Sequence, residues 1–135
     1  MMPTGYNPKQ LSPLTLAFVG DSVYELLVRK TIVSAGSMPV KKLNGKKVEL
    51  VRAAAQAAVY DGLEPILSAE ELEVLRRGRN AHSGSVPKNA QLLEYRKATG
   101  VEALFGFLYL SEHWDRMYAL FDRAMQICQE RGKGE

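Results

Sequence analysis

The sequence has very few of the residues that form disulfides and zinc sites. Cys128 is the only cysteine among 135 residues, so the chain can form no internal disulfide and no cysteine-rich zinc site. The two histidines, His82 and His113, do not stand at the spacing of paired metal ligands. We therefore expect no zinc, and we interpret both histidines as surface residues.

The sequence also lacks a segment that would take it into or across a membrane. No apolar run reaches the roughly 20 residues that a membrane-spanning helix needs. The first residues, MMPTGYNPKQLSP, do not have the charged-then-apolar order of a signal peptide. Together with the single cysteine, these absences favour a cytosolic protein that does not bind membranes.

What is present favours one helical domain. Hydrophobic residues make up 46% of the 135 residues, which suffices for one domain with a core but not for two. No strand-type alternation persists and no segment repeats, whereas apolar residues recur at helical spacing. We predict an all-α helical bundle that forms a single domain over residues 1–135, with a core of about 11–131 and loose termini.

Local signals predict five main helices. Ser12 and Pro13 are an N-cap and first-turn pair for a helix that runs to about Ala35. Ser68 and Glu71 form a capping box at the start of another helix. The expected helices span about 13–35, 46–62, 69–81, 90–111 and 112–131, with a short helix or turn over 38–45 and a polar binding loop over 82–89.

Two acids interrupt otherwise apolar helices. Asp21 lies in LAFVGDSVYELL, where its neighbours one helical turn away are mostly apolar, so we place it on an apolar stripe. Glu102 is the only charged residue in GVEALFGFLYL. Each acid has a glycine nearby, Gly20 or Gly106, which would let another helix approach closely. A single acid of this kind would be explained by pairing with an arginine or by capping a helix.

A pair of such acids favours a metal ion. Two carboxylates that face each other in a low-dielectric interior repel strongly unless a proton or a cation lies between them. Hard divalent cations, Mg²⁺ above all, prefer oxygen ligands. Asp21 and Glu102 are therefore the predicted metal ligands, with Mg²⁺ as the cofactor and Mn²⁺ as its substitute.

Two basic stretches stand out on a chain whose formal net charge is only +3. A charge run alone is more often a solvated face than a binding site. Beside a carboxylate-bound Mg²⁺, however, the two stretches indicate phosphodiester chemistry on a polyanion. The basic residues are Arg76, Arg77, Arg79 and Lys88 in one stretch and Lys41, Lys42, Lys46, Lys47 and Arg52 in the other.

Three motifs resemble those of a known enzyme family. LAFVGDSVYELLVR resembles the signature helix of the ribonuclease III catalytic domain, and VEALFGFLYL resembles its second acidic helix. RRGRNAHSGSVPKN resembles the loop of the short bacterial form, Mini-ribonuclease III, which lacks a double-stranded-RNA-binding domain. The motifs follow the family's order, and the resemblance covers roughly residues 11–128.

The resemblance implies a ribonuclease III endonuclease-domain fold that works as a homodimer. Each subunit would contribute one Mg²⁺-dependent site that cuts one strand of double-stranded RNA and leaves 5′-phosphate and 3′-hydroxyl ends. The family's short form matures the ends of the 23S ribosomal RNA precursor in the bacterial cytoplasm. A large-subunit ribosomal protein is a further candidate partner.

The resemblance places the family's metal-binding aspartate on Asp21 and its metal-binding glutamate on Glu102. Full-length ribonuclease III enzymes carry two more carboxylates, where this chain has Ala17 and Thr99. The short form shares this loss, which leaves the number of metal ions open.

Further candidate site residues follow from the same motifs. Glu25 either assists the metal through a water or pairs with Arg29 at i+4. The predicted RNA contacts are Arg76, Arg77, Arg79 and Lys88, with weaker candidates Lys46, Lys47, Asn80, His82 and Ser83.

The first helix is apolar on all sides, which requires burial on all sides and favours a homodimer. Its apolar residues are Leu14, Leu16, Phe18, Val19, Val23, Tyr24, Leu26, Leu27 and Val28.

Two alternatives to an enzyme remain. A non-catalytic, ribosome-associated RNA-binding module on the same fold would explain the lost carboxylates but not the retention of Asp21 and Glu102. A helical interaction protein with buried salt bridges would leave residues 76–88 unexplained.

Overall fold

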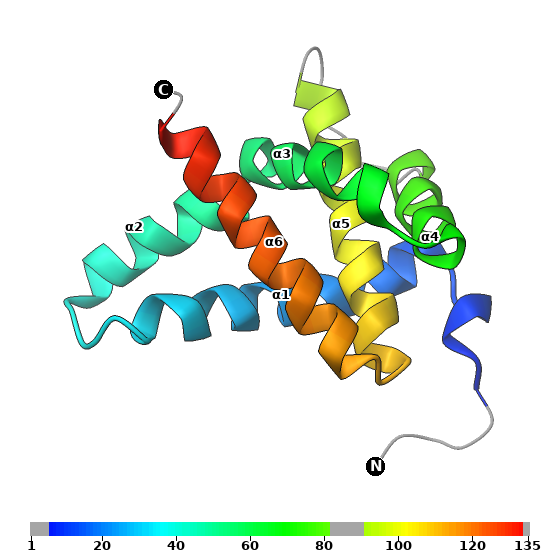
Figure 1. The fold of residues 1–135 in the computed structure, drawn as a ribbon, viewed down its shortest axis with the longest axis horizontal. Helices are drawn as coiled ribbons and strands as arrows, with labels where there is room; N and C mark the ends of the chain where they lie inside the picture. The colour runs from blue at the N-terminus through cyan, green and yellow to red at the C-terminus, as the bar shows by residue number, and fades with distance from the viewer. Residues whose placement is uncertain (1–5, 82–90, 134–135) are drawn as a thin grey trace.

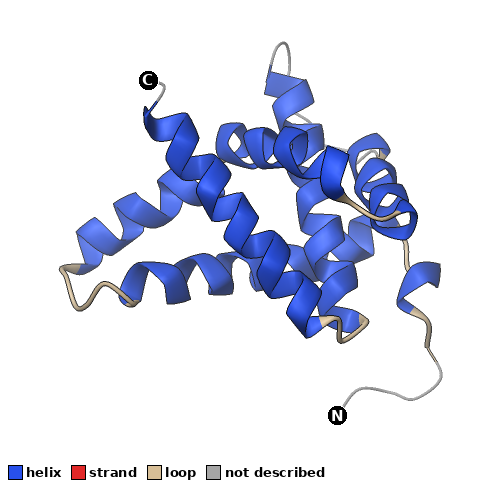
Figure 2. Ribbon diagram, viewed as in Figure 1, coloured by secondary structure: helices blue, strands red, loops and turns tan. Residues whose placement is uncertain are grey.

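A computed structural model describes residues 6–81 and 91–133, and every regular element within these ranges is a helix (Figure 2). The all-α prediction is therefore confirmed. None of these helices combines the length and the apolar character that a bilayer crossing requires. In chain order the elements are η1 (Pro8–Gln10), α1 (Pro13–Val33), α2 (Val40–Val51), α3 (Ala53–Leu63), η2 (Glu64–Ile66), α4 (Ala69–Asn80), α5 (Gln91–Leu110) and α6 (Trp114–Lys133).

Helix α5 is the centre of the fold, with α1, α3, α4 and α6 packed around it (Figure 1). Its second half is almost entirely buried. Three aromatic rings, those of Tyr24, Phe105 and Phe121, meet edge to face with centroids 5.1 to 6.2 Å apart. This geometry is favourable for aromatic pairs, and it ties α1, α5 and α6 into one core.

Glycines allow the helices to cross α5 at backbone contact. A Cβ atom on Gly20 of α1 would overlap the carbonyl of Glu102, and one on Gly106 would overlap that of Leu16. On the α4 side, a Cβ on Gly78 would lie 2.8 Å from the Cβ of Ala103. The prediction that Gly20 lets another helix approach beside the acid is confirmed.

The predicted helix starts are also confirmed. The Ser12 side chain accepts a hydrogen bond from the Thr15 N–H, with Pro13 in the first turn of α1. Ser68 and Glu71 form both bonds of the capping box at the start of α4. These bonds satisfy N–H groups that a helix N-terminus would otherwise leave unpaired.

The prediction of a single helix over 46–62 is wrong. The helix is interrupted at Arg52, whose extended backbone (φ −64°, ψ 157°) ends α2 and begins α3. Helix α2 instead takes in most of the segment predicted as a short helix or turn. The break lets α2 pack along α1 while α3 turns to pack on α5 and α6 (Figure 1).

Candidate active site

The structure brings Asp21 and Glu102 together where α1 crosses α5. Because Gly20 packs directly on the backbone of Glu102, the next side chain of α1 lies beside the Glu102 carboxyl. The two carboxyl groups form a hydrogen bond. Carboxylates act only as acceptors when ionised, so this contact needs a proton between them.

Burial is the main reason why the Glu102 carboxyl holds its proton. Desolvation, and after it the adjacent Asp21 carboxyl, raise its pKa from 4.5 to about 8. A hydrogen bond from Gln56 opposes the shift. At neutral pH the pair therefore resists carrying two negative charges, which is the condition that a bound cation would remove.

The prediction that Asp21 lies on a buried apolar stripe is wrong. Asp21 is exposed, and its apolar neighbour Phe18 is 81% exposed. The buried residues in this part of α1 are Leu16, Ala17, Gly20, Val23 and Tyr24, and α1 packs mainly on α5, so Asp21 lies at the rim of the contact. The acid pair thus has one open member, through which a large substrate can approach.

The donor set fits a hard divalent cation. Asp21 and Glu102 offer only carboxylate oxygens, the ligands that Mg²⁺ prefers. In residues 6–81 and 91–133 no three His, Cys, Asp or Glu side chains gather closely enough to hold a metal by themselves. Water and phosphate oxygens would have to complete the shell, and Mg²⁺ commonly keeps several waters and binds substrate phosphates.

The side chains that stand where full-length ribonuclease III enzymes carry two further carboxylates belong to the core of this protein. Ala17 and Thr99 are both buried, on the faces where α1 and α5 pack into the core. The Thr99 hydroxyl donates a 3.0 Å hydrogen bond to the Tyr95 carbonyl of its own helix. Its polar atom is therefore used inside α5.

Glu25 is engaged by basic residues. It accepts hydrogen bonds from Arg29, with Nη2 at 2.9 Å, and Lys47 Nζ lies 3.9 Å away. Of the two roles predicted for Glu25, the structure shows the pairing with Arg29 at i+4.

Two of the predicted RNA-binding arginines are held by other side chains. Arg76 Nε lies 3.3 Å from Glu64, and Arg79 Nη1 donates a 2.7 Å hydrogen bond to the Tyr60 hydroxyl. Arg79 also donates to the Asn80 side chain. These bonds give Arg79 a structural role in joining α4 to α3.

The other predicted RNA contacts divide into exposed and undescribed residues. Arg77 is exposed and has no ion-pair partner among the described residues. The same holds for Lys41, Lys42 and Lys46 on α2, a helix in which no residue is buried. His82, Ser83 and Lys88 lie outside the described residues.

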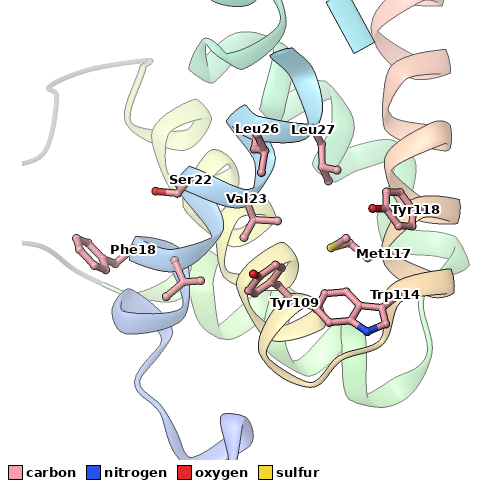
Figure 3. A pocket seen from close by; sticks show the side chains of 10 residues that line it. Phe18, Ser22, Val23, Leu26, Leu27, Tyr109, Trp114, Met117 and Tyr118 are labelled. Atoms are coloured by element: carbon pink, nitrogen blue, oxygen red, sulfur yellow. The ribbon is translucent and has the colours of Figure 1, made fainter. Parts of the chain in front are cut away.

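An apolar groove runs along the face of α1 that is turned toward α6. It encloses about 410 Å³ between α1, the end of α5 and the start of α6 (Figure 3). Phe18 and Leu26 are respectively 81% and 66% exposed. Its lining residues are Phe18, Val19, Ser22, Val23, Leu26, Leu27, Tyr109, Trp114, Met117 and Tyr118.

Sequence reasoning missed Gln56, the side chain that contacts Glu102 from α3. It is only 4% exposed. The available signal was a lone amide in the run AAAQAAV, residues 53–59, where every other side chain is apolar.

Comparison with known proteins assigns the family. The family described as Ribonuclease III domain matches residues 14–113. Mini-ribonuclease 3 of Thermoanaerobacter sp. is 42% identical over 120 residues, 89% of this chain and 84% of that protein. The chain belongs to the ribonuclease III family. Mini-ribonuclease 3 of Symbiobacterium thermophilum is also 42% identical, over 127 residues that make up 94% of this chain and 97% of that protein.

A solved structure supports the same ribonuclease III fold. The crystal structure of a protein from Fusobacterium nucleatum matches with a TM-score of 0.81 at 26% identity, covering 90% of this chain and 99% of that one. The resemblance to Mini-ribonuclease III is thereby confirmed. As a member of this family, the chain is an endoribonuclease and its substrate is RNA.

Proposed function

We propose that this ribonuclease III family member is a Mg²⁺-dependent endonuclease that cuts double-stranded RNA. Its catalytic residues are Asp21 and Glu102, which hold the metal ion. The contact between these two carboxyl groups carries the proposal, because their repulsion is relieved by a cation and one of them opens to solvent. When bound, Mg²⁺ supplies an activated water and neutralises charge on the scissile phosphate. The products carry 5′-phosphate and 3′-hydroxyl ends.

The protein's own contribution is positioning. Helices α1 and α5 hold the two acids at a crossing where glycines bring the two backbones into direct contact. Exposed Asp21 faces the incoming RNA, and half-buried Glu102 is held from behind by Gln56. Exposed cations such as Arg77 hold the RNA backbone, which presents shape, phosphates and 2′-hydroxyls more than readable base edges.

The apolar groove favours a homodimer as the working form. Soluble monomers rarely leave large contiguous apolar patches exposed, yet Phe18, Leu26, Tyr109, Trp114 and Tyr118 are all exposed along this groove. A second copy would cover these side chains and place two acid pairs in one particle, one for each strand of a duplex.

The cellular substrate we propose is the 23S ribosomal RNA precursor, matured in the bacterial cytoplasm. Support comes from the chain's similarity to proteins named Mini-ribonuclease 3 over most of their length. A large-subunit ribosomal protein bound to the precursor is the partner we propose as a source of added affinity.

One incubation tests the enzyme against its alternatives. A labelled RNA duplex is mixed with the protein in Mg²⁺, in Mn²⁺ or in chelator, and product ends are identified by their response to a 5′-phosphate-dependent exonuclease. We expect cutting with either metal and none with chelator. Binding without cutting in Mg²⁺ would favour a non-catalytic RNA-binding module, and metal-independent cutting would exclude the proposed mechanism.

A further inference from the structure

Gln56 connects three helices through one buried amide. It lies in the first turn of α3 and is 4% exposed. Its Nε2 donates a 2.8 Å hydrogen bond to the carbonyl of Val51, the last residue of α2. The same side chain lies near enough to the Glu102 carboxyl on α5 to lower its pKa, as a hydrogen-bond donor does. The amide therefore spans the helix break at Arg52 and one acid of the candidate active site.

The hydrogen bonds determine how the amide is oriented. A backbone carbonyl only accepts, so the nitrogen of Gln56 must face Val51. A primary amide has two N–H groups, and the second is available to the Glu102 carboxyl, whose pKa the amide lowers. The opposite orientation would place Oε1 against the carbonyl of Val51 and forfeit that bond.

The remaining atom of the amide has no partner in the structure. Gln56 Oε1 is buried and accepts no hydrogen bond. Leaving a buried acceptor unpaired destabilises the fold, whereas an apolar side chain of similar volume would avoid this cost. A group that is retained at such a cost calls for a functional explanation.

We propose that Gln56 is a positioning residue that orients the Glu102 carboxylate for the divalent cation. Its N–H would hold one carboxylate oxygen of Glu102 and would leave the other free to serve as a ligand of the cation. The inference rests on the proposed function. Side chains that orient metal ligands in this way commonly change metal affinity by 10–100-fold when they are lost.

A purely structural role would have a different consequence. If Gln56 served only to satisfy the Val51 carbonyl at the helix break, its loss would lower the melting temperature and leave metal binding unchanged. Metal affinity measured without RNA therefore separates the two roles, because it depends on neither substrate binding nor catalysis.

The test measures Mn²⁺ binding by electron paramagnetic resonance in wild type, Gln56→Met, Thr99→Val and Asp21→Asn. Methionine keeps the approximate volume of Gln56 and removes both N–H groups. Thr99→Val is the matched control, since it removes a buried hydroxyl from α5 that bonds only within the helix. Gln56→Leu repeats the test if the methionine variant does not fold, and melting curves in chelator monitor folding.

We expect Gln56→Met to raise the Kd for Mn²⁺ by about 10-fold or more, Thr99→Val to leave it unchanged, and Asp21→Asn to abolish binding. Wild-type affinity in folded Gln56→Met or Gln56→Leu would overturn this inference while the proposed metal site stands. No Mn²⁺ binding by the wild type would overturn the metal site itself and the inference with it.

Discussion

The carboxyl groups of Asp21 and Glu102 share a hydrogen bond across the α1–α5 crossing, with Asp21 exposed and Glu102 half-buried. The arrangement puts an exposed acid against one that resists ionisation. A divalent cation would replace the proton between them, and RNA can reach it from the Asp21 side.

Asp21→Asn and Glu102→Gln should each abolish cleavage while leaving duplex binding largely intact. Both changes remove a proposed metal ligand, and both relieve repulsion, so neither should unfold the domain. Cleavage rates, gel-shift affinities and melting curves check the three expectations. Asp122→Asn, which neutralises an exposed acid on α6, is the control and should cut normally. Normal cleavage by either site variant, or binding lost in step with activity, would contradict the assignment.

Stability without metal should depend on pH through Glu102. Its pKa is raised from 4.5 to about 8 in the fold, so the folded state binds a proton more tightly than the unfolded chain. Stability should therefore fall as pH rises from about 4.5 to about 8 and then level off. Melting temperatures in chelator across this range measure the effect.

Glu102→Gln should remove this part of the pH dependence, because glutamine does not titrate. Mg²⁺ should reduce it in the wild type by taking the place of the proton. Identical pH profiles for wild type and Glu102→Gln in chelator would show that the carboxyl is not held protonated by its surroundings.

Gly20→Ala should destabilise the protein by about 1–3 kcal/mol or more, because the new methyl group would overlap the backbone carbonyl of Glu102. Gly45→Ala is the matched control on α2, where no atom lies within 4 Å of the new Cβ. There, alanine should stabilise the helix by roughly 0.5–1 kcal/mol. Chemical denaturation measures both, and equal effects would mean that α1 and α5 can separate.

Arg77→Ala should weaken duplex binding and flatten its salt dependence by roughly one unit of log–log slope, since a lost phosphate contact releases fewer counterions. Its melting temperature should not change, because Arg77 has no ion-pair partner among the described residues. Arg79→Ala should also lower the melting temperature, because it breaks the bond to Tyr60. Kd values at several salt concentrations decide, with Arg123→Ala on α6 as the control. An unchanged slope for Arg77→Ala would remove it from the RNA contacts.

Phe18→Lys should convert a dimer into a folded monomer, because Phe18 is 81% exposed in the apolar groove. Leu93→Lys changes an exposed apolar residue outside the groove and should leave the dimer intact. Light scattering separates the monomer mass of 15.0 kDa from twice that value. A wild-type monomer at micromolar concentration would refute the proposed assembly.

The sequence by itself determined the helical class and several helix starts. Ser12 and the Ser68–Glu71 capping box bond to N–H groups within one helical turn, so the helix starts can be predicted without knowing the rest of the fold. The two acids beside glycines were equally visible, because a lone charge in an apolar helix stands out locally.

Only the tertiary structure decided where the helix is interrupted and which side of α1 is exposed to solvent. Arg52 is neither glycine nor proline, and the chain breaks there because α2 and α3 pack on different partners. Asp21 has apolar neighbours in sequence, yet it is exposed because α5 covers a different face of α1.

The contact of Gln56 with Glu102 was likewise beyond the sequence, since the two residues lie on different helices that meet only in the fold. Caps and periodicity act within one or two turns of the chain. Burial, and the gathering of Asp21, Gln56 and Glu102 from three helices, depend instead on which helix faces pack together.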